Sequence, residues 1–373
     1  MLNLRIVQAR YGDCLILGYG TQSAPRYLLI DGGPKSVYQR HLRRVLEGIA
    51  AVHGKLDLVI LSHIDEDHID GLLDLANDLL WERIRGLPEL IAFDALWHNS
   101  FSGTLGADIS DRLERIFDRS GLARSSLPHA AKACRDIAQG DQLTRLAHSL
   151  NVPINPGFDG GGILTVEKSS GAIKLGNLSL HIVGPTEANI TELREAWQAW
   201  LEEQENRVLV LSPADAERAV RSLDSSVPNL SSIMVLAEAD GRRILLTGDG
   251  TSEYLEQGLR QAGLLGPGGT LHVDILKLPH HGSKRNITAD FLQRITADRY
   301  VISASGKHGH PHKNTLTWIV DRAKEQGRGI ELVATNSTSS LRALVNECDP
   351  QEYGYRLTMM PEGTNEQVLE LSA

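Results

Sequence analysis

The chain has 373 residues, enough for one large domain or two ordinary ones with a substantial apolar core. Its 47 acidic and 38 basic residues give a net charge of −9, spread along the sequence. This balance argues against capture of nucleic acid by overall charge, although a local basic patch or a bound cation could still receive a phosphodiester. Hydrophobic residues at 41% and charged residues at 23% are values of a globular protein and exclude a disordered chain.

Three cysteines, Cys14, Cys134 and Cys348, are far apart in the chain and show no C-x-x-C spacing. We interpret them as reduced thiols of a disulfide-poor intracellular protein. The N-terminal segment lacks the apolar core of a signal peptide, and no 18 apolar residues run together. We therefore expect no transmembrane helix, no membrane partner and a cytoplasmic location. Nothing in the composition indicates an oligomeric state.

The chain begins with three short predicted strands that are separated by turns, Leu2–Val7, Cys14–Leu17 and Tyr27–Ile30. Apolar spacing predicts a helix over Ser36–Val52, and a continuous apolar run predicts a buried strand over Leu56–Leu61. Next we predict a helix over 69–80, a strand over 91–97, helical segments over 108–150 and 187–223, and a loop over 151–162.

Further strands are predicted at 178–183, 230–237, 243–247, 273–278, 300–303, 330–334 and 341–345, with amphipathic helices at about 251–262 and 314–325. Many short strands interrupted by helices favour an α/β sandwich over a bundle or a barrel. We expect a single domain over residues 1–373, with helical insertions at about 100–160 and 187–225.

The densest chemical signal is SHIDEDHIDG at 62–71, which places His63, Asp65, Asp67 and His68 directly after a buried strand. In extended backbone the first three would lie on one side, whereas His68 begins the next element and can point elsewhere. Such a set can divide its ligands between two neighbouring cations. A solvated acidic turn before a helix is the alternative.

Two more signals follow predicted strands. TGDG at 247–250 places Asp249 between glycines, which alone is also a common turn. PHHGS at 279–283 offers His280 as a ligand, His281 for proton transfer, and Ser283 with its backbone N–H for an oxyanion.

The last signal is the glycine-rich segment 303–312, in which Lys307 accompanies His308, His310 and His312. A mobile loop can hold several histidines without using all of them. Its lysine and histidines could meet a phosphate, because glycines permit close approach of the backbone.

Taken in order, these segments resemble the metallo-β-lactamase superfamily, and more narrowly its ComEC-like branch. The resemblance rests on YGDCLI at 11–16, LLIDGG at 28–33, LSHIDEDHIDG at 61–71, NLSSIMVL at 229–236, TGD at 247–249, PHHGS at 279–283 and GHP at 309–311. It implies an αββα metallo-β-lactamase-like sandwich with a dinuclear metal centre, but the fold carries many hydrolytic chemistries.

The resemblance also implies roles for individual residues. The first ion site would use His63 and Asp65, the second would use Asp67, His68 and His280, and Asp249 would bridge the two ions. Asp13 and Asp31 would orient the ligating histidines from behind. A further histidine that the superfamily usually has before its Gly-Asp segment is not evident; the candidates are His98, His181 and His310.

Asp65 stands where most of the superfamily has histidine. A carboxylate is a harder ligand than imidazole and shifts preference from zinc toward manganese, magnesium or iron(II). We expect two divalent ions as cofactors, with manganese and zinc as the first candidates.

We therefore expect a metal-dependent hydrolase of phosphodiesters, either a nuclease or a cyclic-nucleotide phosphodiesterase, that uses a metal-bridging hydroxide. The expected catalytic residues are Asp67, His281 and His310; either histidine could protonate the leaving oxygen, and Lys307 or Ser283 could hold the non-bridging oxygens. One alternative is hydrolysis of lactones, esters or β-lactams by the same hydroxide. Another is a metal-binding sensor or interaction module on a hydrolase fold.

Overall fold

The structure is a computed structural model that describes residues 1–100, 103–104, 106, 111–112, 128–158, 162–207 and 231–371. Most of residues 108–127 in the predicted helical segment 108–150 lie outside these residues, as do residues 208–223 of the segment 187–223 and the first residue of the predicted strand 230–237.

Two β-sheets form the centre of the protein. The strands of the first are β1 (Leu2–Val7), β2 (Leu15–Gly20), β3 (Pro25–Ile30), β5 (Leu58–Leu61), β7 (Leu96–His98) and β16 (Glu366–Leu371). Those of the second are β8 (Ile173–Leu175), β9 (Leu178–Gly184), β10 (Met234–Ala239), β11 (Arg242–Leu246), β12 (Leu271–Lys277), β13 (Ile295–Ile302), β14 (Ile330–Ala334) and β15 (Tyr355–Met359). The spatial orders are β16-β1-β2-β3-β5-β7 and β15-β14-β13-β12-β11-β10-β9-β8. A separate pair joins β4 (Lys55–Leu56) to β6 (Ala92–Phe93).

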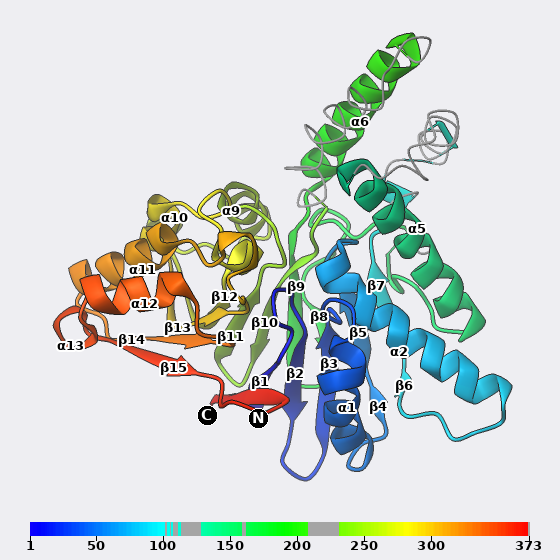
Figure 1. Ribbon diagram of the computed structural model, residues 1–373, viewed down its shortest axis with the longest axis horizontal. Helices are drawn as coiled ribbons and strands as arrows, with labels where there is room; N and C mark the ends of the chain where they lie inside the picture. The colour runs from blue at the N-terminus through cyan, green and yellow to red at the C-terminus, as the bar shows by residue number, and fades with distance from the viewer. Residues whose placement is uncertain are drawn as a thin grey trace.

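Helices cover the outer face of each sheet (Figure 1). Beside the first sheet lie the π-helix η1 (Tyr38–Leu42) with its continuation α1 (Arg43–Ala50), α2 (Glu66–Ile84) and α5 (Pro128–Ser149). Beside the second lie α9 (Ser252–Gln261), α10 (Ala289–Arg294), α11 (Lys313–Glu325), α12 (Ser339–Glu347) and α13 (Pro350–Tyr353). The helix α6 (Glu187–Arg207) projects away from both sheets in Figure 1.

Three apolar cores hold these layers together. Alternate residues of a strand point to opposite faces, so Leu15 and Leu17 of β2 pack between the two sheets, whereas Ile16 packs toward the helices of the first sheet. A third core joins the second sheet to its own helices, for example through Phe291 and Leu316. The result is a mixed α/β sandwich of four layers, helix, sheet, sheet and helix.

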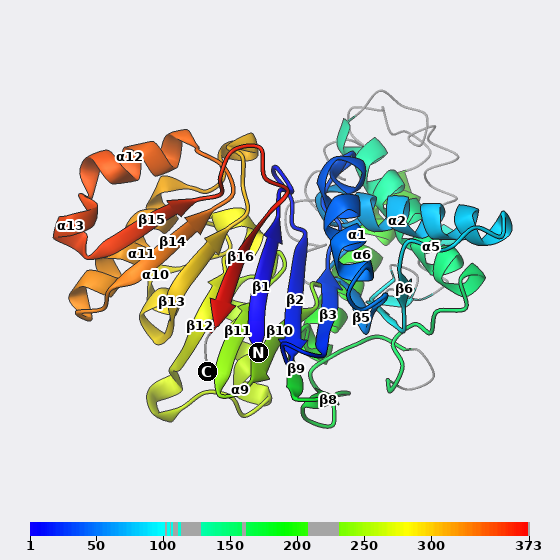
Figure 2. The ribbon, with the colours of Figure 1, turned by 90° about the horizontal axis from the view of Figure 1, so that it is seen from below.

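Parallel strands determine where the site lies. In the first sheet β3, β5 and β7 are parallel, and in the second β11 to β15 are parallel. The carboxyl ends of parallel strands meet at one edge of a sheet, where loops can gather polar side chains. The last strand, β16, pairs antiparallel with β1, so the two chain ends lie close together (Figure 2).

Most predicted elements are present, and two have the predicted bounds, the strands at 2–7 and 330–334. The predicted strand at 341–345 is wrong, because these residues lie in α12. Thr338 caps that helix by accepting a hydrogen bond from the backbone N–H of Leu341, and Leu341 and Leu344 share its buried face. A short apolar run does not distinguish a strand from a helix. The strands β8, β15 and β16 were not predicted.

None of the helices among the described residues combines the length and apolar character needed to cross a bilayer.

Candidate metal centre

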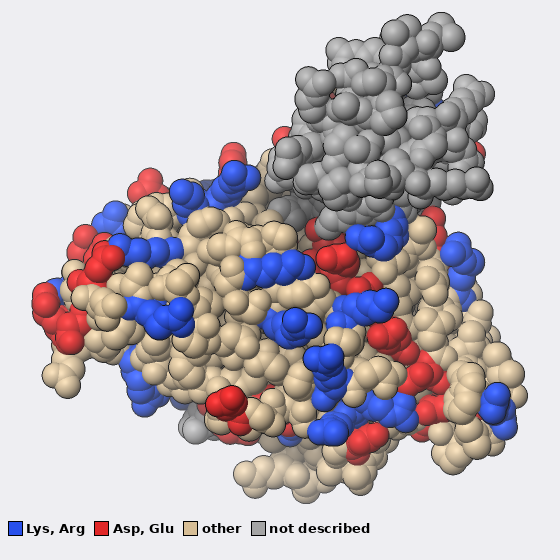
Figure 3. Space-filling view, viewed as in Figure 1, with Lys and Arg blue, Asp and Glu red and all other residues tan. Residues whose placement is uncertain are grey.

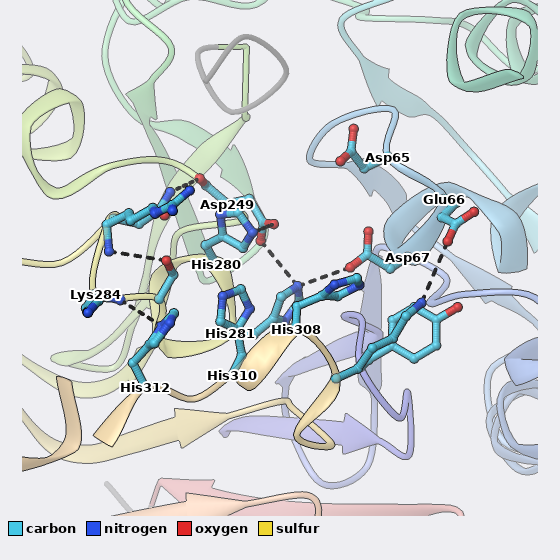
Figure 4. Close-up of a pocket in the computed structure, with 15 residues that line it drawn as sticks. Asp65, Glu66, Asp67, Asp249, His280, His281, Lys284, His308, His310 and His312 are labelled. Atoms are coloured by element: carbon cyan, nitrogen blue, oxygen red, sulfur yellow. Dashed lines mark hydrogen bonds and ion pairs between the residues drawn. The ribbon is translucent and has the colours of Figure 1, made fainter. Parts of the chain in front are cut away.

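The candidate site lies where the carboxyl ends of strands from both sheets meet. His63 follows β5, Asp249 follows β11, and His280 and His281 follow β12. Of these, Asp249, His280 and His281 border a cavity of about 580 Å³ (Figure 4). The lining residues are Tyr11, Asp65, Glu66, Asp67, Asp249, His280, His281, Ser283, Lys284, Arg285, Asn286, Lys307, His308, His310 and His312.

Two glycines bring the ligand-bearing loop against the end of β3. The backbone N–H of Gly32 donates to the carbonyl of His68 at 2.7 Å, and that of Gly71 donates to the carbonyl of Gly33 at 3.0 Å. A Cβ added at Gly71 would lie 1.9 Å from the carbonyl oxygen of Gly32, so only glycine permits this approach. The first turn of α2, which carries Asp67 and His68, is thereby held beside the strand ends.

The carboxylate of Asp249 is at the centre of the site, and each of its oxygens faces two imidazoles. Oδ1 lies 3.4 Å from Nε2 of His68 and 3.6 Å from Nε2 of His281. Oδ2 lies 3.9 Å from Nε2 of His63 and 3.6 Å from Nε2 of His280. The four histidines therefore form two pairs, one on each side of the carboxylate.

Hydrogen bonds on the far side of three histidines select the proton position of each ring. Nδ1 of His68 donates to Asp31 at 2.9 Å, and Nδ1 of His281 donates to the carbonyl of Ser303 at 2.9 Å. The hydroxyl of Ser62 donates to Asp31 at 2.7 Å and can accept from Nδ1 of His63 at 3.1 Å. With the proton on Nδ1, Nε2 keeps the lone pair that ligates a metal.

Four buried atoms of Asp249 and the histidines around it have no hydrogen-bond partner. They are Nε2 of His63, His68 and His281, and Oδ1 of Asp249. One donor atom from each of Asp13, His68, Asp249 and His281 lies within 4.8 Å of the others. Buried polar atoms are normally paired, and imidazole nitrogens with carboxylate oxygens are a ligand set for divalent cations. The residues present therefore fit a metal centre.

The backbone at the histidine pair is strained. His280 and His281 adopt positive φ angles of 46° and 54° within the 3₁₀ turn η4 (Pro279–Gly282). Left-handed conformations at residues other than glycine cost about 1 to 3 kcal/mol each and occur mainly at functional sites. Here they turn two consecutive rings toward the same carboxylate.

Opposite charges dominate the electrostatics of the cluster. Burial alone would raise the pKa of Asp249, but His280, His281 and His68 hold it well below its ordinary value. Burial opposes the charged form of His281, yet Asp249 and Asp13 raise its pKa to about 10. For His68, Asp249 and Asp31 likewise outweigh burial and raise the pKa well above the ordinary value. The ionised carboxylates attract positive charge, which a divalent cation supplies in place of protons.

Three other groups at the site also have shifted pKa values. Burial alone would raise the pKa of Asp67, but the imidazoles of His281 and His68 lower it far below its ordinary value. Burial and the neighbouring His68 lower the pKa of His63. Burial, together with His280 and His281, lowers the pKa of His310 to about 3.

Basic side chains stand at the mouth of the cavity. Lys284 and Arg285 are exposed on one side, separated from the histidine pair by two residues. On the other side Nζ of Lys307 lies 3.3 Å from the ring centre of Tyr11 and 3.9 Å from Oε1 of Glu66. Figure 4 shows Lys284 and Glu66 at opposite ends of the histidine cluster.

The other predicted residues on the cavity side lie as follows. Asp65 precedes α2 at its N-cap and lines the cavity, on the side away from the histidines in Figure 4. Ser283 is buried in the lining, and its hydroxyl accepts a hydrogen bond from the backbone N–H of Arg285 at 3.2 Å. The ring of His310 lies 5.1 Å from that of His280.

Two candidates for the missing histidine lie outside the cavity lining. His98 is fully buried at the end of β7, where burial lowers its pKa to about 4. His181 is half-buried on β9, opposite Leu236 of β10.

His281, rather than His280, lies beside Asp67 in the structure. The sequence placed His280 with Asp67 and His68 and left His281 for proton transfer. In the structure it is Nε2 of His281 that lies 3.4 Å from Asp67, whereas His280 faces the other oxygen of Asp249. Spacing in the sequence does not reveal which of two adjacent rings turns inward, because that depends on the strained turn.

Sequence reasoning gave no role to several residues that support the site, among them Lys277, Ser62 and Ser303. Lys277 had a readable signal, since a lysine at the end of a buried apolar strand needs a partner. Ser62 and Ser303 had none, because a serine beside a motif is ordinary.

Comparison with known proteins gives partial matches. No protein-family model matches the chain. The chain is 33% identical over 97 residues to the anti-Pycsar protein Apyc1 of Paenibacillus harenae, which covers 24% of this chain and 36% of that protein. It is 31% identical over 121 residues to ComE operon protein 3 of Bacillus subtilis strain 168, covering 32% of this chain and 14% of that protein. The matches thus span about a third or less of these relatives' own length.

Two solved structures are distant likenesses. A protein assigned as a metal-dependent hydrolase from Parabacteroides distasonis has 10% identity and a TM-score of 0.37, over 89% of this chain and 93% of the other. A diphosphatase of the PhnP family has 13% identity and a TM-score of 0.40, over 99% and 98%. At these values neither likeness bears on activity.

Proposed function

We propose that this chain is a dinuclear metal-dependent hydrolase of phosphodiesters. The observation that carries the proposal is the division of four imidazoles between the two oxygens of Asp249, at distances of 3.4 to 3.9 Å. A carboxylate that faces two ligand pairs is suited to bridge two cations.

The geometry favours one allocation of ligands. The second ion site would consist of Asp67, His68 and His281, with Oδ1 of Asp249. The first would consist of His63 and His280, with Oδ2 of Asp249, and the sequence motif adds Asp65 to this set. His280 would then supply the third protein ligand that the sequence pattern lacks, in place of His98, His181 or His310.

Divalent cations at these positions would supply an activated water and would neutralise negative charge that develops on the substrate. The chain itself would provide the rest of the chemistry. Lys307 on one side, with Lys284 and Arg285 on the other, would attract an anionic substrate. His310 lines the cavity beside His280, where its neutral imidazole would donate a hydrogen bond to the leaving oxygen, and Ser283 would hold a non-bridging oxygen.

The distribution of charge favours a compact substrate. On the face drawn in Figure 3, Lys and Arg side chains of the described residues are interspersed with Asp and Glu. The net charge of −9 also argues against a broad basic surface for a nucleic acid duplex. The basic groups at the cavity instead suit a small phosphodiester, such as a cyclic nucleotide.

We also propose membership of the metallo-β-lactamase superfamily, in its ComEC-like branch. The ordered motifs support this proposal, and the partial match to ComE operon protein 3 is in line with it.

The test combines metal analysis of the purified full chain with a substrate screen. The screen contains bis-p-nitrophenyl phosphate, single- and double-stranded nucleic acids, cyclic mono- and dinucleotides, and lactones. We expect two divalent ions per chain, hydrolysis of phosphodiesters, loss of activity on chelation and recovery with manganese or zinc. The Asp249→Asn variant, purified in parallel, controls for contaminating enzymes.

Activity that survives exhaustive chelation with no residual metal would refute a metal-dependent mechanism. Turnover of lactones without phosphodiesters would support the alternative substrate class, and two bound ions without hydrolysis of any compound would favour a sensor.

A further inference from the structure

Lys277, the last residue of β12, is 1% exposed. It is the only lysine or arginine that is buried among the residues that the structure describes. Burying an ammonium costs several kcal/mol unless it is paired and hydrogen-bonded. The partners of the Lys277 ammonium therefore indicate its role.

The ammonium of Lys277 contacts two segments of the metal centre. It forms an ion pair with Oδ2 of Asp13, whose side chain is also 1% exposed. It donates a hydrogen bond to the carbonyl of Gly248 at 3.2 Å, directly before Asp249 in the chain. The same carbonyl accepts from the backbone N–H of His280 at 3.2 Å.

Asp13 continues the connection to a candidate ligand. Its other oxygen, Oδ1, lies 3.5 Å from Nδ1 of His281, the nitrogen opposite the one that faces Asp67 and Asp249. The backbone N–H of Asp13 donates to the carbonyl of Asp67 at 3.2 Å. Asp13 is thus held between Lys277 and the second ion site.

A carboxylate behind a ligating imidazole orients the ring and increases its basicity. Without a cation behind it, Asp13 would be a buried anion next to Asp67 and Asp249, which also carry negative charge. Lys277 offsets that charge and keeps the oxygens of Asp13 in place.

We propose that Lys277 is a positioning residue of the metal centre, which acts through Asp13 to hold His281 in the orientation that binds the second ion. This inference rests on the proposed dinuclear centre and extends it to a residue outside the ligand set. It predicts that loss of the ammonium weakens one ion site and leaves the other intact.

The experiment measures binding of Mn²⁺ to the metal-free full chain by titration calorimetry, for the wild type, Lys277→Met, Asp13→Asn and the double variant. Both single variants should bind one of two ions about 10- to 100-fold more weakly. Because Lys277 acts through Asp13, the double variant should match Asp13→Asn within about twofold. Lys324→Met, which removes an exposed lysine of α11 paired with Glu352, is the matched control and should bind both ions normally.

Wild-type affinity for both ions in Lys277→Met would overturn the inference, as would additive losses in the double variant. Lys277→Met leaves the carboxylate of Asp13 buried without its cation, whereas the double variant removes both charges. If Lys277→Met does not fold, the double variant is therefore compared with Asp13→Asn. Wild-type binding by Asp13→Asn alone would equally refute the connection. Because the readout is metal binding, a wild type that binds two ions but hydrolyses no phosphodiester contradicts the proposed function and not this inference.

Discussion

Replacement by asparagine should affect the two buried aspartates differently: Asp31→Asn should cost more folding stability, and Asp249→Asn should cost more metal affinity. Asp31 accepts three hydrogen bonds, from the backbone N–H of Ser62 at 2.7 Å, its hydroxyl at 2.7 Å and Nδ1 of His68 at 2.9 Å. The last two reach the same oxygen, which an amide nitrogen cannot replace as an acceptor. Hydrogen bonds to a charged group contribute about 1.5 to 3 kcal/mol each, so Asp31→Asn should lower the free energy of unfolding by about 3 kcal/mol or more.

Asp249→Asn should spare the fold and remove the metal. Oδ1 of Asp249 accepts no hydrogen bond, and both oxygens lie 3.4 Å or more from the imidazoles. The change in unfolding free energy should therefore be smaller than for Asp31→Asn. Loss of the shared ligand should weaken binding of at least one ion by more than about 100-fold, whereas Asp31→Asn should weaken it by about 10- to 100-fold.

Urea unfolding of the metal-free variants and metal titration of the same preparations measure the two effects. The reasoning fails if Asp249→Asn keeps two ions with near-normal turnover. It also fails if Asp31→Asn proves less destabilising than Asp249→Asn, because the hydrogen bonds of Asp31 would then contribute little.

Three further predictions concern single residues. Asp65→His should raise the ratio of zinc to manganese affinity, because imidazole is the softer donor; an unchanged ratio in competition titrations would mean that Asp65 does not ligate. His310→Ala should slow hydrolysis of substrates with poor leaving groups, such as nucleosides, far more than hydrolysis of p-nitrophenyl esters. An equal loss of rate for both substrate classes, together with loss of bound metal, would make His310 a ligand. Asp57 lies outside the site and tests the fold alone. Burial would raise its pKa, but hydrogen bonds from Arg26 and Tyr19 lower it below 3.8. The contribution of Asp57 to the free energy of unfolding is therefore present above pH 3.8 and lost as the pH falls through the folded-state pKa. Asp57→Asn should lower the unfolding free energy at neutral pH, and the difference from wild type should shrink in acid; a difference independent of pH would contradict the assignment.

Much of the architecture follows from local patterns in the sequence. The continuous apolar run at 58–61 is suited to burial on both faces, and it forms β5, an interior strand between β3 and β7. The polar loop after it had to lie at a strand end, which is where the structure places it. By contrast, the five residues 341–345 carry no periodicity long enough to decide between strand and helix, and the capping hydroxyl of Thr338 decides for α12.

The sequence by itself determined which motifs meet at the site, because motifs at the carboxyl ends of parallel strands converge on one edge. The tertiary structure alone decided how they divide. Asp13, Asp249 and His281 are separated by up to 268 residues in the chain, yet their donor atoms lie within 4.8 Å. Left-handed backbone at His280 and His281 aims the two rings at different oxygens of one carboxylate, and Lys277 reaches Asp13 only because β12 and the loop after β1 pack together. Such choices depend on long-range packing and backbone strain, which no local spacing encodes.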